Sequence, residues 1–186
     1  MTQSELFEFP EIPKKLVDEF RILKKNITKL NGTRFTIVTS FLLLNKIYTY
    51  LDSYNQFVST FSVCKKGCSH CCKNSIHLTA LEAEYICQNA EIEPNSIPIK
   101  KENNKAFCPF LNKSDQCDIY EFRPFNCRTL HALDHPKYCL TGEDHMLYGA
   151  SGYGYGVTVY EQLAIIIQQI NKHNKNDDIR SFFSTI

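Results

Sequence analysis

Apolar residues recur at helical spacing near the start of the chain, between Pro13 and about Leu30. Five of them lie three or four positions apart, the interval at which side chains share one face of an α-helix. They are Leu16, Phe20, Leu23, Ile27 and Leu30. The Asn31-Gly32 pair that follows is typical of a helix end. This stretch therefore predicts an amphipathic helix.

A longer helical pattern runs from about Arg34 to Phe61, and many of its apolar positions are aromatic. We expect a buried face formed by Ile37, Phe41, Leu44, Tyr48, Leu51, Phe57 and Val58. A helix with such a stripe usually packs against the core. The same aromatic face also suits a docking surface for a protein partner, which is a weaker hypothesis.

The rest of the chain combines shorter helical segments with irregular loops. Thr79 and Glu82 have capping-box spacing and predict a helix from about Ala80 to Asn89. A polar, proline-marked surface connection follows at 91–105. Further helical segments are expected at 119–122, at 158–171 and at 179–183.

These elements predict a mainly α fold in which helices pack around an irregular, cysteine-rich metal-binding core. A chain of 186 residues has the length of one domain. Within a single domain, 1–186, we distinguish an N-terminal helical pair (1–60), a cysteine cluster region (61–139) and a C-terminal loop and helix (140–186).

Composition and charge argue against several classes of function. Lys and Arg total 21 against 20 for Asp and Glu, so the basic excess that attracts nucleic acid or an anionic membrane is missing. The longest aliphatic run, Phe41–Leu44, is far too short for a membrane span. The opening residues, MTQSELFEFPEIP, lack the basic start and apolar stretch of a secretory signal. We therefore expect a cytoplasmic protein that binds neither nucleic acid nor membrane.

Nine cysteines change this plain picture, and four of them fall between Cys64 and Cys72. A reducing cytosol keeps thiols free, and an odd number of cysteines does not fit a complete disulfide framework. Two thiolates separated by two residues can both approach one metal ion to about 2.3 Å. Metal ligation is therefore the favoured interpretation, with a redox dithiol or disulfides as alternatives.

Eight of the cysteines form two blocks and are the candidate metal ligands. They are Cys64, Cys68, Cys71, Cys72, Cys108, Cys117, Cys127 and Cys139. Eight thiolates suffice for two four-thiolate sites. Because neighbouring side chains diverge, Cys71 and Cys72 are not expected to serve one ion in the same way. Cys87, at an apolar position of a predicted helix, is expected to be an ordinary buried thiol.

Three runs within these blocks resemble a known family. The runs CKKGCSHCC (Cys64–Cys72), CPFL (Cys108–Leu111) and CDIYEFRPFNCR (Cys117–Arg128) are similar to the motifs of the YkgJ-type cysteine cluster family, the CxxCxxCC zinc- or iron-chelating domain. The resemblance covers about Phe61 to Cys139. It departs from the family at Ser69-His70, where many members have Gly and another residue.

The resemblance implies a site for zinc or an iron–sulfur cluster, with [4Fe–4S] the expected form if the metal is iron. A similar cysteine motif occurs in the flagellin lysine methylase, which needs an iron–sulfur cluster and S-adenosylmethionine. This implies a second hypothesis, an iron–sulfur-dependent enzyme of S-adenosylmethionine-linked methyl transfer. Thiolates suit both metals, and the double cysteine slightly favours iron–sulfur. Because the cysteine loops are poor in apolar residues, we expect the metal to contribute to folding.

Histidines and a glycine-rich run lie beside the cysteines. His70, His131 and His135 are weaker ligand candidates, since Cys₃His sites are common for zinc. The Gly- and Tyr-rich run 148–156 precedes too short a segment for a dinucleotide-binding unit. It is expected to be a structural turn or an aromatic-lined loop near the metal.

Two arginines flank Cys127. Arg123 and Arg128 are expected either to donate N–H bonds to thiolates or to form salt bridges within their own segment.

Overall fold

The structure, a computed structural model, describes residues 8–29, 35–92, 107–141, 143–150, 154–171 and 175–183. Within these ranges the fold is mainly α, as the sequence predicts. The helices are α1 (Lys14–Thr28), α2 (Ile37–Val58), α3 (Ala80–Ala90), α4 (Phe125–Arg128), α5 (Tyr138–Thr141), α6 (Thr158–Ile170) and α7 (Ile179–Phe182).

Shorter elements complete the described part of the chain. They are two 3₁₀ helices, η2 (His70–Lys73) and η3 (Tyr120–Phe122), and four strands, β1 (His77–Thr79), β2 (His131–Ala132), β3 (Leu147–Tyr148) and β4 (Asn176–Asp178). The strands form two antiparallel pairs, β1 with β4 and β2 with β3. No helix in the described ranges is both long and apolar enough to cross a membrane.

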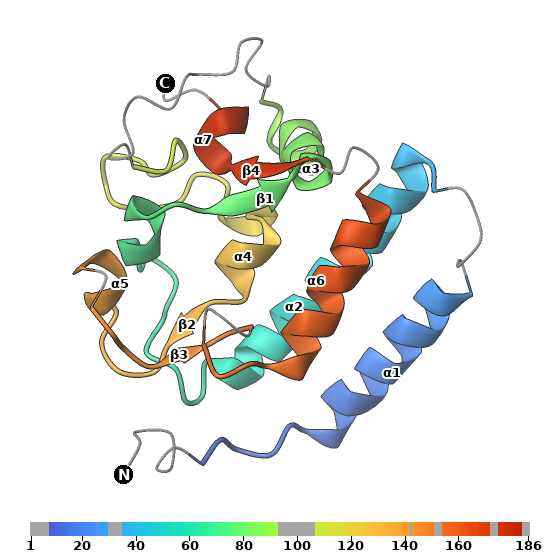
Figure 1. Ribbon diagram of the computed structural model, residues 1–186, viewed down its shortest axis with the longest axis horizontal. Coiled ribbons are helices and arrows are strands. Elements are labelled where there is room, and N and C mark those ends of the chain that lie inside the picture. The colour runs from blue at the N-terminus through green and yellow to red at the C-terminus, as the bar shows by residue number, and fades with distance from the viewer. Residues whose placement is uncertain are drawn as a thin grey trace.

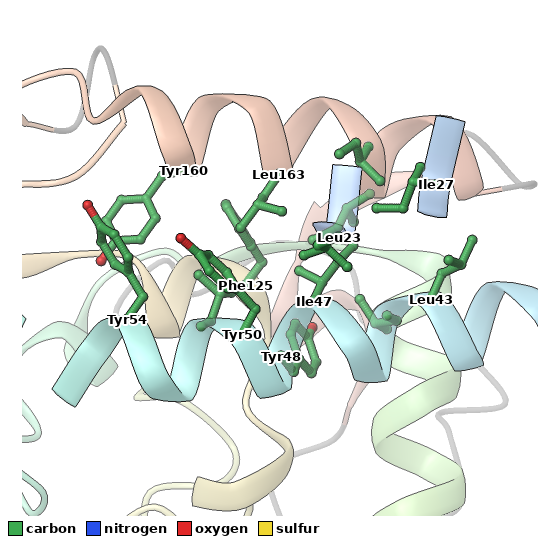
Figure 2. Close-up of a cluster of buried hydrophobic side chains, with 14 of the residues drawn as sticks. Leu23, Ile27, Leu43, Ile47, Tyr48, Tyr50, Tyr54, Phe125, Tyr160 and Leu163 are labelled. Atoms are coloured by element: carbon green, nitrogen blue, oxygen red, sulfur yellow. The ribbon is translucent and has the colours of Figure 1, made fainter. Parts of the chain in front are cut away.

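The three longest helices, α1, α2 and α6, lie side by side along one flank of the molecule (Figure 1). Their apolar faces share one core, in which Leu163 of α6 and Leu23 of α1 approach α2 (Figure 2). Leu44, Ile47 and Leu51 of α2 are completely buried in this core. Burial of such side chains contributes roughly 1.5–3 kcal/mol each. Apolar burial thus holds these helices together.

Helix α2 differs from its expected form in length and in its buried face. It begins at Ile37, after a capping box in which the hydroxyl of Thr36 accepts from the backbone N–H of Thr39. Ile37 is 37 % exposed, whereas the predicted stripe missed several residues that lie in the core. These are Leu43, Ile47, Tyr50 and Tyr54. The stripe is broader than one helical face because α1, α3, α4 and α6 all contact α2. Tyr48 of the predicted stripe is buried, and Phe41 and Phe57 are half-buried against the core, which agrees with a core-facing helix. Docking of a protein partner on this face stays a prediction.

The other half of the molecule consists of short elements around a second, smaller core (Figure 1). Leu78, Ile86 and Ile119 are buried there together with Cys108. Of the cysteine loops, which the sequence shows to be poor in apolar residues, the second contributes Phe110 and Ile119 to this core. That the metal contributes to folding stays a prediction. These core residues are far apart in the sequence, so no periodic pattern predicts that they share a core.

The C-terminal segment forms part of this second half. Strand β4 pairs with β1, which follows the double cysteine closely in the sequence. The Asp178 carboxylate accepts hydrogen bonds from Ser75 Oγ at 2.5 Å and from the Ile76 N–H at 3.2 Å. Arg180 donates to the carbonyl of Asn74 at 2.9 Å. The chain end thereby anchors the segment that carries the double cysteine.

Most predicted helical segments are confirmed. The helix after Thr79 is α3, and the segments at 158–171 and 179–183 are α6 and α7. The segment at 119–122 is the 3₁₀ helix η3. The sequence analysis missed the strands, α4 and α5, which are too short to show a period. The Asn31-Gly32 pair and most of 91–105 lie outside the described residues.

Candidate metal centre

The candidate ligands come from four places in the fold. Cys64, Cys68, Cys71 and Cys72 lie in the loop after α2 and in η2, and Cys139 lies in α5 beside η2. Cys108 and Cys117 bound a loop that is closed by an antiparallel bridge between Leu111 and Cys117. Cys127 lies in α4. The nine cysteines all lie in the described ranges, and none of them forms a disulfide.

Backbone hydrogen bonds join these segments. The N–H of Ala132 donates to Cys64 Sγ at 3.1 Å, and the N–H of Val63 donates to the Ala132 carbonyl at 2.9 Å. The N–H of Cys108 donates to the carbonyl of Cys72 at 2.8 Å. Cysteines far apart in the sequence are therefore held in one region by the peptide backbone.

Cys64, Cys68 and Cys139 form a first group of neighbouring thiols. A hydrogen bond from the Cys64 thiol to Cys68 raises the pKa of Cys64 and lowers the pKa of Cys68 to about 5. Nδ1 of His70 lies 3.6 Å from Cys68 Sγ and favours the same thiolate. Burial, together with Cys71 and Cys68, raises the pKa of Cys139 to about 11.

Cys108, Cys117 and Cys127 form a second group within the smaller core. Burial raises the pKa of all three thiols, to about 11 for Cys108. The pKa of Cys127 is raised further by Cys71, Cys108 and Cys117. Burial and mutual repulsion therefore disfavour the thiolate form of all three unless a cation compensates their charge.

Cys71 lies between the two groups. Its ionised form would raise the pKa of thiols in both groups, at Cys139 and at Cys108, Cys117 and Cys127. Its own pKa is raised by a hydrogen bond to Cys72 and by burial. Cys72 packs against the second apolar core. The two adjacent cysteines thus have different surroundings.

The thiols lie in one region of the fold, but they are not arranged as the ligands of a bound metal ion. Among the side chains that the structure describes, no three His, Cys, Asp or Glu groups converge closely enough to hold one metal ion. The cysteine-rich core of the expected fold is thus present, whereas no formed metal cluster is shown within the described ranges.

Arg123 supplies positive charge next to the second group. Its guanidinium stacks on the Tyr120 ring, 3.9 Å from the ring centre, and its buried Nε has no hydrogen-bond partner. The guanidinium opposes the burial-driven rise in the pKa of Cys117 and Cys127. A half-buried cation with an unused, buried N–H, beside thiols that pack against the second core, fits a thiolate-bound metal, whose net charge is negative.

Arg128 has a different role from the expected contact with sulfur. It is 2 % exposed, and its Nη1 donates to Asp52 Oδ1 at 2.5 Å. Its other donors reach the backbone carbonyls of Glu121 and Arg123. Its guanidinium also lies over the Tyr48 ring, 4.3 Å from the ring centre. Arg128 therefore holds α4 and η3 against α2, and so positions Cys127 indirectly.

The three candidate histidines have different surroundings. His131 Nε2 lies 3.1 Å from the Arg128 carbonyl and 3.3 Å from the Tyr160 hydroxyl, and burial lowers its pKa to about 4. His135 Nδ1 accepts from the Lys137 N–H at 3.2 Å. Of the three predicted candidates, His70 is the one that contacts a cysteine sulfur in the described structure.

A cavity of about 260 Å³ borders the thiols, and Cys71, Cys127 and Cys139 all contribute to its wall. Leu147 and Ala150 also line it, so the start of the Gly- and Tyr-rich run lies beside the cysteines, as one of its two interpretations predicted. The run turns back tightly here, because a Cβ at Gly154 would lie 2.5 Å from the Leu147 carbonyl oxygen. Residues 151–153 are outside the described ranges.

The sequence analysis missed one polar pair at this cavity. His145 lines the cavity, and its Nδ1 lies 3.2 Å from Asp134 Oδ1. The two residues are 11 positions apart and meet only because β2 pairs with β3. No local signal in the sequence marks them as partners.

With this arrangement established, the chain can be compared with known proteins. Residues 63–145 match the family model described as "CxxCxxCC: Putative zinc- or iron-chelating domain". The match covers a little under half of the chain and contains the three motifs that predicted a resemblance to this family. The match supports metal binding in general. No curated protein and no solved structure matches the chain.

Proposed function

We propose that the protein binds zinc or an iron–sulfur cluster through the thiolates of its two cysteine groups, with Cys71 as the ligand that joins them. In this proposal the ligands are Cys64, Cys68 and Cys139 on one side and Cys72, Cys108, Cys117 and Cys127 on the other. The metal completes an arrangement that the fold has already assembled.

The observation that carries the proposal is the position of Cys71. It lines one cavity together with Cys127 of α4 and Cys139 of α5, and its ionised form would raise the pKa of Cys108 and Cys117 in the neighbouring loop. A buried thiol packs like any other small apolar side chain, so packing alone does not require cysteine at all of these positions. Thiolate ligands for a cation explain why they are assembled.

The surroundings also support a negatively charged thiolate centre. Arg123 adds a half-buried positive charge with an unused N–H, and Ala132 already donates an N–H to Cys64 Sγ. Donors of this kind stabilise thiolates bound to a metal. Because most of these thiols are protonated without a metal, binding displaces their protons and couples metal affinity to folding.

The test is elemental analysis with a visible spectrum on protein purified without oxygen. Iron with labile sulfide and a brown absorption near 400 nm, roughly as for thiolate-ligated clusters, is the outcome that the double cysteine favours. Zinc without colour assigns a structural or zinc-handling site. Protein that holds neither metal after purification and reconstitution contradicts the proposal.

Single substitutions test the ligand assignment. We expect Cys71→Ser to lose most of the metal, and Cys68→Ser and Cys127→Ser each to lose the metal of its group together with solubility. Cys87→Ser is the matched control, because Cys87 is a thiol of the same region outside both groups. Equal metal content in all four variants would show that these thiols are not the ligands.

S-adenosylmethionine-linked methyl transfer is still a prediction, which rests on the resemblance alone. Its first requirement is an iron–sulfur cluster in the purified protein. The metal analysis therefore decides whether binding of S-adenosylmethionine is worth measuring.

A further inference from the structure

The turn between the first two cysteines of the motif places their thiols side by side. The N–H of Cys68 donates to the carbonyl of Lys65 at 2.9 Å, which closes a β-turn over residues 65–68. Gly67 is the third residue of this turn, and its φ of 94° lies in the left-handed region that glycine enters without strain. The chain therefore reverses its direction here, and the Cys64 thiol donates a hydrogen bond to Cys68.

Both sulfurs are also held by groups outside the turn. The N–H of Ala132 in β2 donates to Cys64 Sγ at 3.1 Å, and Nδ1 of His70 in η2 lies 3.6 Å from Cys68 Sγ. Two thiols that are already in contact lose little further freedom when a bond joins them. The arrangement therefore favours a disulfide between these two cysteines.

The pair can be reached by small molecules from solution. Cys64 and Cys68 are half-buried, and the three residues between them are exposed. A small disulfide can therefore approach a sulfur without unfolding of the chain. Cys71 and Cys72 are also hydrogen-bonded to each other. Because they are adjacent in the sequence and neighbouring side chains diverge, a bridge between them would require the backbone to move.

We propose that Cys64 and Cys68 form a reversible disulfide by exchange with a low-molecular-weight disulfide of the glutathione type. One cysteine sulfur attacks the reagent disulfide and releases one reagent thiol, and the second cysteine then attacks the mixed disulfide and releases the other. The protein loses two electrons to the reagent, and the two cysteine protons leave on the released thiols.

The bridge also controls the first group of candidate metal ligands. It joins both sulfurs to each other, so neither remains as a thiolate ligand while the bridge is present. Disulfides that form in a reducing compartment are usually transient, and redox sensing is one of their common roles. This effect on metal binding rests on the proposed function, whereas formation of the bridge does not.

The experiment exposes the protein, purified without oxygen, to oxidised glutathione. The remaining thiols are alkylated, and mass spectrometry of tryptic peptides identifies each disulfide. Trypsin cleaves after Lys65 and Lys66, so a bridge between Cys64 and Cys68 appears as two linked peptides. We expect this bridge to form at least about tenfold faster than any other disulfide within the protein, and to disappear on reduction with dithiothreitol. No bridge at this pair, or faster formation of another one, would overturn the inference.

Gly67→Ala tests the contribution of the turn. A Cβ at Gly67 would meet no atom within 4 Å, so the substitution strains the backbone at a positive φ without a steric contact. We expect formation of the bridge to slow about fivefold. Lys65→Arg is the matched control, because it changes an exposed side chain of the same turn and keeps its charge and the cleavage site. Equal rates in both variants would refute the inference that this turn prepares the pair.

Metal analysis of the same samples separates this proposal from the metal centre. The metal content should fall as the bridge forms, and return after reduction and addition of the metal. A constant metal content in protein that forms the bridge would refute the control of metal binding. If the protein forms the bridge but never holds metal, only the metal centre is refuted. If it holds metal but does not form the bridge, only the redox pair is refuted.

Discussion

The helical region, formed by α1, α2 and α6, and the cysteine region, formed by residues 63–145 with β4 and α7, are held together by different forces. In the helical region, long helices bury continuous apolar faces, and Leu44, Ile47, Leu51 and Leu163 are fully buried. In the cysteine region, short elements are joined by individual hydrogen bonds to backbone groups and by a small core that includes thiols. The first region is stabilised by periodic burial, and the second by specific polar contacts that a metal would complete.

A buried carboxylate connects the two regions. Glu82, at the start of α3, accepts from the Tyr48 hydroxyl of α2 at 2.9 Å and from the Phe125 N–H of α4 at 2.7 Å. Its second oxygen accepts from the N–H and the hydroxyl of Thr79, at 2.8 and 2.9 Å. A capping residue, predicted from the sequence as a local helix start, is thus also a polar link between the helical region and the cysteine region.

Removal of the metal should cause the largest difference in behaviour between the two regions. After chelation, we expect amide hydrogen exchange in residues 63–145 to become at least about 100-fold faster, because metal binding and folding are coupled there. The amides in the middle of α2 and α6 should keep most of their protection. Hydrogen exchange followed by mass spectrometry measures both regions in one sample. A uniform increase along the chain would show that the regions do not differ in this way.

A substitution that leaves a cavity in the helical core should have the opposite effect: it should lower the stability of the fold without changing the metal content. Leu51→Ala removes a fully buried side chain and is expected to lower the free energy of unfolding by about 3 kcal/mol. The metal content of the folded protein should not change. Urea denaturation with metal analysis tests this, and Ile165→Ala, at a position 58 % exposed on α6, should cost less than about 0.5 kcal/mol. Loss of metal in Leu51→Ala would contradict the separation.

The link between the regions can be weakened at Glu82. Glu82→Gln keeps the side-chain shape but replaces one accepting oxygen with an NH₂ group that opposes a donor. We expect the free energy of unfolding to fall by about 2 kcal/mol in urea denaturation. Glu121→Gln is the control, because the Glu121 side chain is 73 % exposed and pairs with an equally exposed Lys66. A similar small loss in both variants would mean that the buried network adds little.

The smallest expected change in stability concerns Asp178, which fixes the C-terminal segment to the residues after the double cysteine. Burial acts to raise the pKa of Asp178, but hydrogen bonds from Ser75 and Arg180 outweigh it, so its pKa is lowered on folding. A lowered pKa stabilises the fold above the ordinary Asp pKa, and this contribution is lost as the pH falls through the folded value. Asp178→Asn should therefore cost about 1 kcal/mol at pH 7 and progressively less below about pH 4. Unfolding midpoints of both proteins between pH 7 and pH 3 measure this, and a constant difference would contradict it.

By itself the sequence determined the long helices, the capping box at Thr79 and Glu82, and the family of the cysteine motifs. Each of these depends on residues close together along the chain, through helical period, cap spacing or motif spacing. What it misjudged in α2 has a clear reason. A helix contacted by several elements buries more than one face, and the sequence does not state which neighbours will cover it.

The tertiary structure alone decided how the cysteines are grouped and what surrounds them. Cys139 reaches the first group because α5 contacts η2, and Cys108 joins the second because its N–H bonds to the carbonyl of Cys72. The contacts of Arg128 with Asp52, of Asp134 with His145 and of Asp178 with Ser75 also join distant positions. Such contacts depend on chain packing rather than on local spacing, so residue patterns along the sequence carry no direct sign of them.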